Sequence, residues 1–281
     1  MTQSNSVGIE NIDIEIPLFL EAIFQKYSYD FRDYSKAHVK RRLMHRMSIG
    51  NFTSVSQMQE KVLRDKEFFI DLLEDLSINV TEMFRDPDFY KSFRENVVPS
   101  LKTYPFIKIW HAGCSTGEEV YSLAILLHEE GILDRCQIYA TDFNRKVLEI
   151  AKLGIYHTQD LDKFQRNYSN SSGKAQLSDY YTLKYGSIKF DQALSKKVVF
   201  ADHNLVTDHV FAEVNLILCR NVLIYFNREL QNKVIGLFHE SLTHSGHLCL
   251  GSKESLKFTQ FENNFVDIDS KQKIFKKKIS R

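Results

Sequence analysis

Apolar residues recur along the chain with two different spacings, which divide it into a helical first part and a mixed second part. From Ile16 to about Leu76 they return every three to four residues, so several helices separated by short polar breaks are predicted. One break ends in Thr53 and Ser54, and either side chain can cap the helix that follows. The simplest interpretation is a small all-α domain at residues 10–78.

The second part alternates short apolar strands with amphipathic helices, which is typical of a parallel sheet with helices on both faces. Strands are predicted at residues 107–112, 137–141, 197–202, 214–219, 248–251 and about 273–277. The predicted fold class is therefore α/β, with a doubly wound, Rossmann-like sheet domain at residues 89–281. Residues 79–88 join it to the helical domain.

The stretch from about Tyr156 to Lys197 departs from this alternation. It contains short alternating segments, a polar turn at residues 169–173 and several tyrosines close together. We predict a small antiparallel β-subdomain at about residues 160–197, formed by a β-hairpin or three-stranded flap preceded by a helix. An exposed strand of such a flap can add a partner peptide as a further strand, or the flap can be an embellishment without a partner.

Charge and composition exclude several function classes. Lys and Arg total 37 against 36 Asp and Glu, so the global charge predicts neither a nucleic-acid coat nor an acidic tail. No signal sequence and no apolar run of about 18 residues is present, so we expect a soluble, cytoplasmic protein. The four cysteines form no Cys-x-x-Cys pair and are expected to be buried thiols. His244 and His247 lack further ligands in register, so no metal site is predicted.

The candidate chemistry gathers where the first two strands of the sheet end. The first is followed by Gly113-Cys114-Ser115-Thr116-Gly117 and a helix, a turn whose free N–H groups can face a ligand. The second ends on Asp142, the position at which a carboxylate accepts the hydroxyls of a nucleotide ribose. Together they predict a site for an adenosine-type cofactor.

Other interpretations of these residues remain open. The two glycines can serve only as turn residues, and Asp142 can cap the next helix. The turn also fits the Gly-x-Ser-x-Gly nucleophile elbow of α/β-hydrolases. That fold needs several strands before the elbow, whereas the first hundred residues here are predicted to be helical.

Two further segments carry unusual polar side chains. One predicted helix crowds Lys40, Arg41, Arg46 and other basic residues onto one face, which is either an ordinary solvated face or a docking surface for an acidic partner. The join between the domains carries Asn79, Thr81 and Arg85 in otherwise apolar sequence. A linker across the mouth of a cofactor site would explain them. Asp86 with Pro87 then predicts a helix start, with Asp as the cap.

Four segments in order resemble the CheR-type methyltransferases. These are Asn79-x-Thr81-x-Met83-Phe84-Arg85, Gly113-Cys114-Ser115-Thr116-Gly117-Glu118-Glu119, Ala140-Thr141-Asp142 and Cys219-Arg220-Asn221-Val222-Leu223-Ile224-Tyr225-Phe226. The resemblance covers nearly the whole chain. It implies an S-adenosylmethionine-dependent protein-glutamate O-methyltransferase that acts on chemotaxis receptors and releases S-adenosylhomocysteine. Met83 departs from the family, which usually has a second Phe there.

The resemblance also implies roles for individual residues. Asp142 would take the ribose hydroxyls, Glu118 the methionine end of the cofactor, and Tyr225 the incoming substrate. Arg85, Arg220 and Tyr225 are the predicted catalytic residues. The predicted cofactor-binding residues are Asn79, Thr81, Arg85, Gly113, Glu118, Asp142, Asn204, Leu205, Cys219, Arg220 and Asn221.

The partners implied are the glutamate-bearing methylation helices of chemoreceptors, contacted through Lys40, Arg41 and Arg46. In some members of the family the β-subdomain also holds a receptor's C-terminal peptide. We expect a monomer that meets the membrane only through receptors and binds no nucleic acid or metal. The alternatives are a methyltransferase with another acceptor and a regulatory module that only binds the cofactor.

Overall fold

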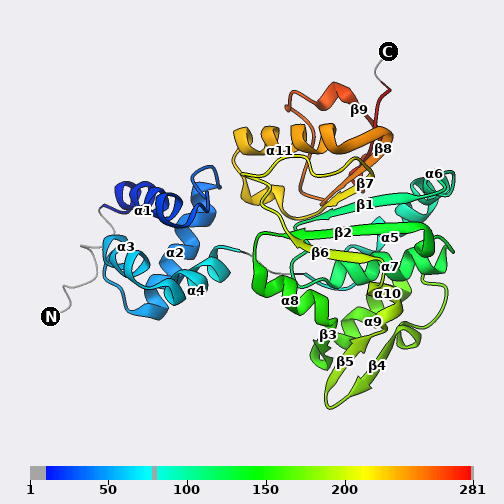
Figure 1. The fold of residues 1–281 in the computed structure, drawn as a ribbon, viewed down its shortest axis with the longest axis horizontal. Helices are drawn as coiled ribbons and strands as arrows, with labels where there is room; N and C mark the ends of the chain where they lie inside the picture. Colours follow the sequence, from blue (N-terminus) through cyan, green and yellow to red (C-terminus); the bar gives the residue numbers. More distant parts are fainter. Residues whose placement is uncertain (1–10, 78–80, 280–281) are drawn as a thin grey trace. The chain divides into compact units, whose positions relative to one another are not determined.

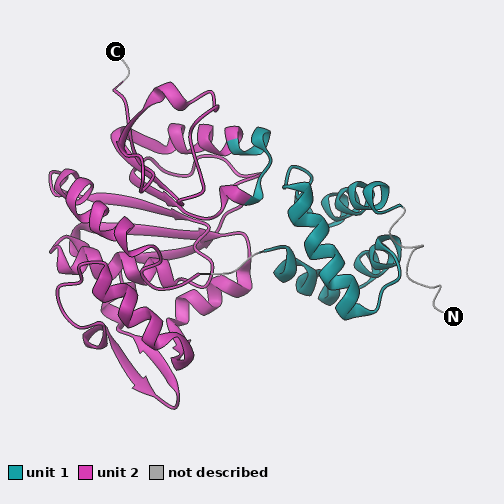
Figure 2. Cartoon of the chain, turned by 180° about the vertical axis from the view of Figure 1, so that it is seen from behind, with its two compact units in different colours: residues 1–78, 225–231 teal, residues 79–224, 232–281 magenta. Residues whose placement is uncertain are grey.

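The computed structural model describes residues 11–77 and 81–279, and contacts within the chain divide it into two compact units (Figure 2). One unit comprises residues 1–78 with 225–231, and the other comprises residues 79–224 and 232–281. No helix in the described part of the chain is long and apolar enough to cross a membrane.

The first unit is helical, as the apolar spacing predicted. Its helices are α1 (Ile12–Tyr27), α2 (Lys36–Gly50), α3 (Val55–Arg64) and α4 (Lys66–Leu76). Ser54 caps α3 by accepting a hydrogen bond from the backbone N–H of Gln57 (3.1 Å), so one of the two predicted caps is used. The core is made of fully buried apolar side chains, among them Phe19, Ile23, Leu43, Met58 and Leu72.

Residues 225–231 pack with these helices. The backbone N–H of Ser35 donates to the carbonyl of Tyr225 (2.8 Å), and that of Asn227 donates to the carbonyl of Asp33 (2.9 Å). The rings of Tyr34 and Phe226 lie edge to face at 5.0 Å. The segment that carries Tyr225 is therefore fixed to the turn that precedes α2.

Seven strands of the described chain form the main sheet of the second unit (Figure 1). They are β1 (Ile107–Ala112), β2 (Cys136–Asp142), β6 (Val198–Asp202), β7 (Val214–Cys219), β8 (Leu242–Leu250), β9 (Phe265–Asp269) and β10 (Ile274–Lys277). Their order is β6-β2-β1-β7-β8-β10-β9. The first five strands of this order run parallel, and β10 and β9 are antiparallel to their neighbours. The prediction of a doubly wound α/β sheet is thus confirmed.

Strand β9 was not among the predicted strands. It is a short edge strand whose apolar residues Val266 and Ile268 are exposed, so it lacks a buried face that alternation could reveal. In the part of the chain that the structure describes it pairs with β10 alone, with a register shift between Ile274 and Phe275. Its hydrogen bonds to β10, which follows after a short turn, make it a strand.

The strand order reverses at β1. From there the chain proceeds outward through β2 to β6, and later returns to place β7 and β8 on the other side of β1. In an open parallel sheet a crevice for ligands forms at such a reversal, beyond the carboxyl ends of the strands. The turn after β1 and the loop after β7 therefore border the predicted ligand site.

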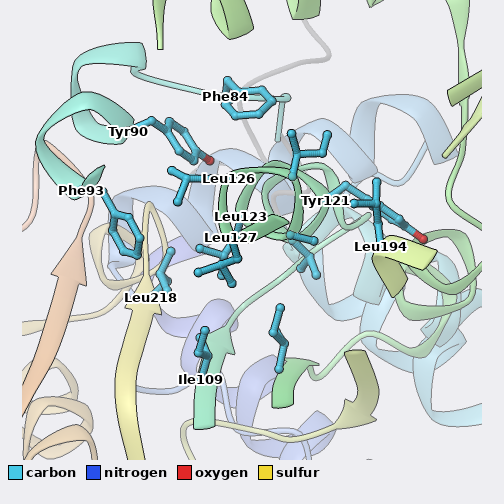
Figure 3. Close-up of a cluster of buried hydrophobic side chains, with 14 of the residues drawn as sticks. Phe84, Tyr90, Phe93, Ile109, Tyr121, Leu123, Leu126, Leu127, Leu194 and Leu218 are labelled. Carbon is cyan, nitrogen blue, oxygen red and sulfur yellow. The ribbon is translucent and has the colours of Figure 1, made fainter. Parts of the chain in front are cut away.

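The two faces of the sheet are covered by different helices. The helices that cover the sheet are α5 (Pro87–Asn96), α6 (Val98–Leu101), α7 (Glu118–Glu129), α8 (Arg145–Leu153) and α11 (Arg228–Ser241), and only residues 228–231 of α11 are grouped with the first unit. Residues 118–127 of α7 are all buried, and Figure 3 shows its leucines between Ile109 and Leu218 of the sheet and Phe84, Tyr90 and Phe93. On the opposite face Trp110 of β1 meets Phe238 of α11, with ring centroids 5.4 Å apart.

A second, antiparallel sheet follows α8. It consists of β3 (Ile155–His157), β5 (Ser187–Phe190) and β4 (Tyr181–Lys184), in that order, with α9 (Leu161–Asn170) between β3 and β4 and α10 (Gln192–Ser195) after β5. The predicted three-stranded flap is present, but α9 lies inside it and does not precede it. The first strand escaped prediction because only three residues form it.

A buried ion-pair network ties α7, β7 and the start of α5 together. The guanidinium of Arg220 lies 3.2 Å from the carboxylate of Glu119 and 2.8 Å from that of Asp86, and it stacks 4.0 Å from the ring centre of Phe89. Asp86 precedes α5 as expected, but its side chain makes no capping bond and pairs with Arg220. Burial acts to raise the pKa of Glu119, yet Arg220 and His111 lower it to about 2.

This network predicts an acid-sensitive contribution to stability. Because the pKa of Glu119 is depressed from 4.5 to about 2, its carboxylate stabilises the fold above pH 4.5 and loses that effect as the pH falls to about 2. We expect Glu119→Gln to lower the free energy of unfolding by about 3 kcal/mol at neutral pH, and by much less at about pH 3. Urea denaturation at the two pH values measures both differences.

Glu149→Gln is the matched control, since Glu149 pairs with Lys152 on an exposed helix face. It should leave stability nearly unchanged at either pH. A Glu119→Gln protein as stable as the wild type at neutral pH would contradict the assignment.

Candidate active site

The turn between β1 and α7 is shaped by two glycines in the left-handed region. Gly113 has φ of 73° and Gly117, which caps α7, has φ of 94°. A Cβ at Gly113 would lie 2.5 Å from Val222, and one at Gly117 would lie 2.8 Å from Ala151. Both the left-handed backbone and the close packing therefore require glycine at these two positions. At Gly113 the absence of a side chain lets the turn pack against Val222, in the loop after β7.

Asp142 ends β2 beside this turn and is almost fully buried, with 7% of its surface exposed. Its carboxylate accepts the backbone N–H groups of Ser115 (2.9 Å) and Asn144 (3.0 Å). Burial raises the pKa of Asp142, although these amide donors act against the increase. Asn144, not Asp142, caps α8 by accepting the N–H of Lys146 (3.0 Å), so the capping alternative is excluded. A carboxylate can accept about four hydrogen bonds, so these amide donors do not prevent Asp142 from accepting a ligand hydroxyl as well.

Glu118 is the first residue of α7 and is also buried. Its carboxylate accepts the hydroxyl of Thr116 (2.7 Å). Burial raises the pKa of Glu118, and the Thr116 hydrogen bond opposes that increase. The hydroxyl of Tyr156, from β3, donates to the carbonyl of Thr116 (2.7 Å) and so fixes the turn from outside.

The end of β6 joins the same edge of the sheet. The backbone N–H of His203 donates to the carbonyl of Asp142 (3.3 Å), which draws the residues after β6 toward the end of β2. Leu205 is buried, and Asn204 closes a turn by accepting the N–H of Val206 (3.0 Å). Asn204 and Leu205, which the family resemblance places at the cofactor, therefore follow β6, the strand that pairs with β2 beside Asp142.

The end of β7 supplies Cys219, Arg220 and Asn221. Cys219 is completely buried, and the side chain of Arg220 is 2% exposed, with its terminal nitrogens engaged by Glu119, Asp86 and the carbonyl of Arg85 (3.3 Å). Asn221 adopts φ of 61°, and its Oδ1 atom is buried without a hydrogen-bond partner among the described residues.

Ser115, in the glycine turn, has an equally isolated hydroxyl. Its Oγ is buried and has no hydrogen-bond partner in the described part of the chain. A nucleophilic serine needs an adjacent base, so the hydrolase interpretation has no support. Because isolated buried polar atoms are uncommon, Ser115 and Asn221 instead fit an edge that receives a polar ligand.

The predicted catalytic and cofactor-binding residues lie in three parts of the structure. Thr81 and Arg85 are half-buried in the segment before α5, where the carbonyl of Arg85 accepts a hydrogen bond from Arg220, whereas Asn79 lies outside the described residues. Tyr225 packs with the helical unit, where its ring lies edge to face with His38 at 4.8 Å. Gly113, Glu118, Asp142, Asn204, Leu205, Cys219, Arg220 and Asn221 lie at the carboxyl ends of β1, β2, β6 and β7.

The three basic residues predicted to contact a partner lie on α2, but they differ in their surroundings. Lys40 forms an exposed ion pair with Asp13 (2.9 Å). Arg41 lies on the exposed surface beside His38. Arg46 is half-buried, pairs with Asp75 and donates to the carbonyl of Asp71 (3.0 Å), so it also joins α2 to α4.

Sequence reasoning missed two acidic residues that shape the site. Glu119 pairs with Arg220, and a charge directly before the mostly apolar run of residues 120–127 is a signal that could have revealed it. Glu254, in the loop after β8, accepts backbone N–H groups from the loop that follows β7. Its position three residues after Gly251 carries no comparable signal.

Comparison with known proteins places both units in one family. Residues 79–274 match the S-adenosylmethionine-binding domain of the CheR methyltransferases, and residues 14–77 match their all-α domain. The Cher3 protein of Pseudomonas putida is 53% identical over 267 residues, covering 95% of this chain and 98% of that one.

More distant relatives are named chemotaxis protein methyltransferases. That of Vibrio anguillarum is 31% identical over 78% of this chain and 80% of its own length. That of Listeria monocytogenes is 26% identical over 88% of this chain and 92% of its own. The family resemblance inferred from the motifs is confirmed, and the chain belongs to the CheR family of S-adenosylmethionine-dependent methyltransferases.

Proposed function

We propose that this protein transfers a methyl group from S-adenosylmethionine to glutamate side chains of chemoreceptors, on the cytoplasmic side of the membrane. The proposal is supported mainly by the contacts between the family's motif segments at one sheet edge. The glycine turn donates backbone N–H groups to residues 141 and 142 at the end of β2, and Arg220 donates to the carbonyl of Arg85. The names of the Vibrio and Listeria relatives support chemotaxis as the setting.

The residues at this edge fit the cofactor. Asp142 is held in place by two amide donors and suits the two hydroxyls of the ribose, while the carboxylate of Glu118 suits the ammonium group of the methionine end. The isolated polar atoms of Ser115 and Asn221 offer further hydrogen bonds. When bound, the cofactor supplies an activated methyl group on its sulfonium centre.

The chemistry requires positioning more than proton transfer. A free glutamate has a pKa near 4.3, so its carboxylate is already the nucleophile at neutral pH and needs no general base. We propose that Arg85 and Tyr225 orient this carboxylate or that of the cofactor, as a cation and a hydroxyl donor. Since its terminal nitrogens are occupied, Arg220 contributes by fixing residues 85–86.

Two surfaces are proposed to contact receptors. Lys40 and Arg41 on α2 are the basic residues best placed to meet glutamate-bearing helices, while Arg46 contributes charge from a half-buried ion pair. Within the described residues β4 pairs only with β5 and its side chains are mostly exposed, so its free edge can add a receptor peptide.

The proposed reaction is tested by methyl transfer to membranes that contain chemoreceptors. Methyl-labelled S-adenosylmethionine should label the receptors, and mild base should release the label as methanol because the product is an ester. Label that resists base would indicate a different acceptor group. Cofactor binding without any transfer to receptors would favour a regulatory module.

A substitution at Asp142 tests the cofactor site. Asp142→Asn keeps the side-chain shape but removes the charge that strengthens hydrogen bonds to the ribose, so the Kd for S-adenosylmethionine should rise about ten- to a hundredfold. Calorimetry measures this directly. Asp202→Asn is the control, because Asp202 is the neighbour of Asp142 in the sheet and pairs with Arg145. Equal affinities of the Asp142→Asn protein and the wild type would refute the ribose assignment.

A substitution at Tyr225 tests the division between binding and transfer. Tyr225→Phe removes one hydroxyl donor, so methyl transfer should slow about three- to tenfold while cofactor affinity stays unchanged. Tyr185→Phe, at the exposed turn between β4 and β5, serves as the control. If the Tyr225→Phe protein lost cofactor affinity in proportion to its rate, the assigned role would be wrong.

A further inference from the structure

The loop after β8 contains a buried carboxylate that bonds almost entirely to backbone amides. Glu254 is 4% exposed. One of its oxygens accepts the N–H groups of Val222 (2.8 Å) and Ile224 (3.3 Å), and the other accepts those of Asn221 (3.1 Å) and Gly251 (2.5 Å). Three of the four donors belong to the loop that directly follows Arg220.

Such an arrangement is strong because one acceptor is charged. Hydrogen bonds from amides to a carboxylate are shorter and stronger than those to a neutral oxygen, and burial removes competing water. Burial raises the pKa of Glu254, and backbone amides, among them those of Gly251, Asn221 and Val222, act in the opposite direction. Beyond the end of β7 the carboxylate of Glu254 thus accepts the backbone N–H groups that a neighbouring strand would otherwise accept.

The loop held in this way has a conformation that needs support. Asn221 adopts φ of 61°, which a residue other than glycine seldom does, and its side-chain oxygen is buried without a partner among the described residues. The next residue, Val222, fills the space beside Gly113, where a Cβ would lie 2.5 Å from it. The position of the loop therefore sets the position of the glycine turn.

Gly251 is fitted closely around the same carboxylate. A Cβ at Gly251 would lie 2.7 Å from the backbone nitrogen of Asn221 and 2.8 Å from Oε2 of Glu254. Any side chain there would separate the carboxylate from the amides that it holds.

From these contacts we propose that Glu254 is a positioning residue for the methyltransferase site. Its carboxylate fixes residues 221–224, and through them the side chain of Asn221 and the contact between Val222 and Gly113. Glu254 itself touches neither cofactor nor substrate. The inference rests on the proposed cofactor site but not on the identity of the methyl acceptor.

The test combines amide exchange with cofactor binding in the full-length protein. In Glu254→Gln the charge is lost at nearly constant shape, so the amides of Asn221, Val222 and Ile224 should exchange with solvent about tenfold faster or more. The Kd for S-adenosylhomocysteine should rise by a similar factor while the melting temperature of the bulk fold changes little. Glu262→Gln is the control, since Glu262 is exposed and accepts a single amide from Phe258 (2.9 Å).

Gly251→Ala provides a second, independent variant that leaves the carboxylate in place. It should reproduce both effects, and it carries the test alone if Glu254→Gln does not fold. Unchanged exchange at the three amides in a folded variant would overturn the inference. Faster exchange with unaltered cofactor affinity would overturn it equally, because Glu254 would then support only the fold.

Neither readout uses a methyl acceptor, so the result is separable from the proposed reaction. If receptors are not methylated but the two variants lose cofactor affinity, the role of Glu254 stands and the acceptor assignment fails. If receptors are methylated and the variants bind cofactor normally, the acceptor assignment stands and the role of Glu254 fails.

Discussion

The buried ion pair between Arg220 and Glu119 is the interaction on which the arrangement of the site depends. Removing both charges from water is costly, and the cost is offset only while their geometry is maintained. The pair forces the end of β7 to meet the first turn of α7, and the second carboxylate on Arg220, from Asp86, adds the segment before α5. Three parts of the chain that are distant in sequence therefore cannot move independently.

The two adjacent acidic residues at the start of α7 have different partners and differently shifted pKa values. Glu118 bonds with Thr116 in the glycine turn, whereas Glu119 points to the Arg220 network. Burial raises the pKa of the first, while neighbouring cations depress the pKa of the second to about 2. Two adjacent carboxylates at one helix start thus bind different partners, the first in the turn before the helix and the second in the ion-pair network.

Much of the fold was predictable because its signals are local. The helices of residues 12–76, the turn after β1 and the acidic end of β2 all follow from apolar spacing and a few glycines. Two features were missed for different reasons. Strand β9 is a short edge strand whose apolar residues Val266 and Ile268 are exposed, so its pairing with β10 left no clear pattern. Asp86 binds Arg220, which is distant in the sequence, instead of capping a helix. The role of Glu254 could not be predicted from the sequence, because its carboxylate meets the loop after β7 only when β8 pairs with β7.

The hydrogen bond from Tyr156 to the carbonyl of Thr116 limits how freely the small sheet can be exchanged between relatives. The same tyrosine also lies 3.1 Å from where a Cβ of Gly117 would be, so β3 belongs to the glycine turn as much as to its own sheet. A chimaera that replaced the subdomain from β3 onward would remove a buried partner of the turn. A junction placed after Tyr156, with β4 and β5 as the exchanged part, would leave the turn supported. The part of the small sheet that can be exchanged therefore begins at β4, although the sheet itself begins at β3.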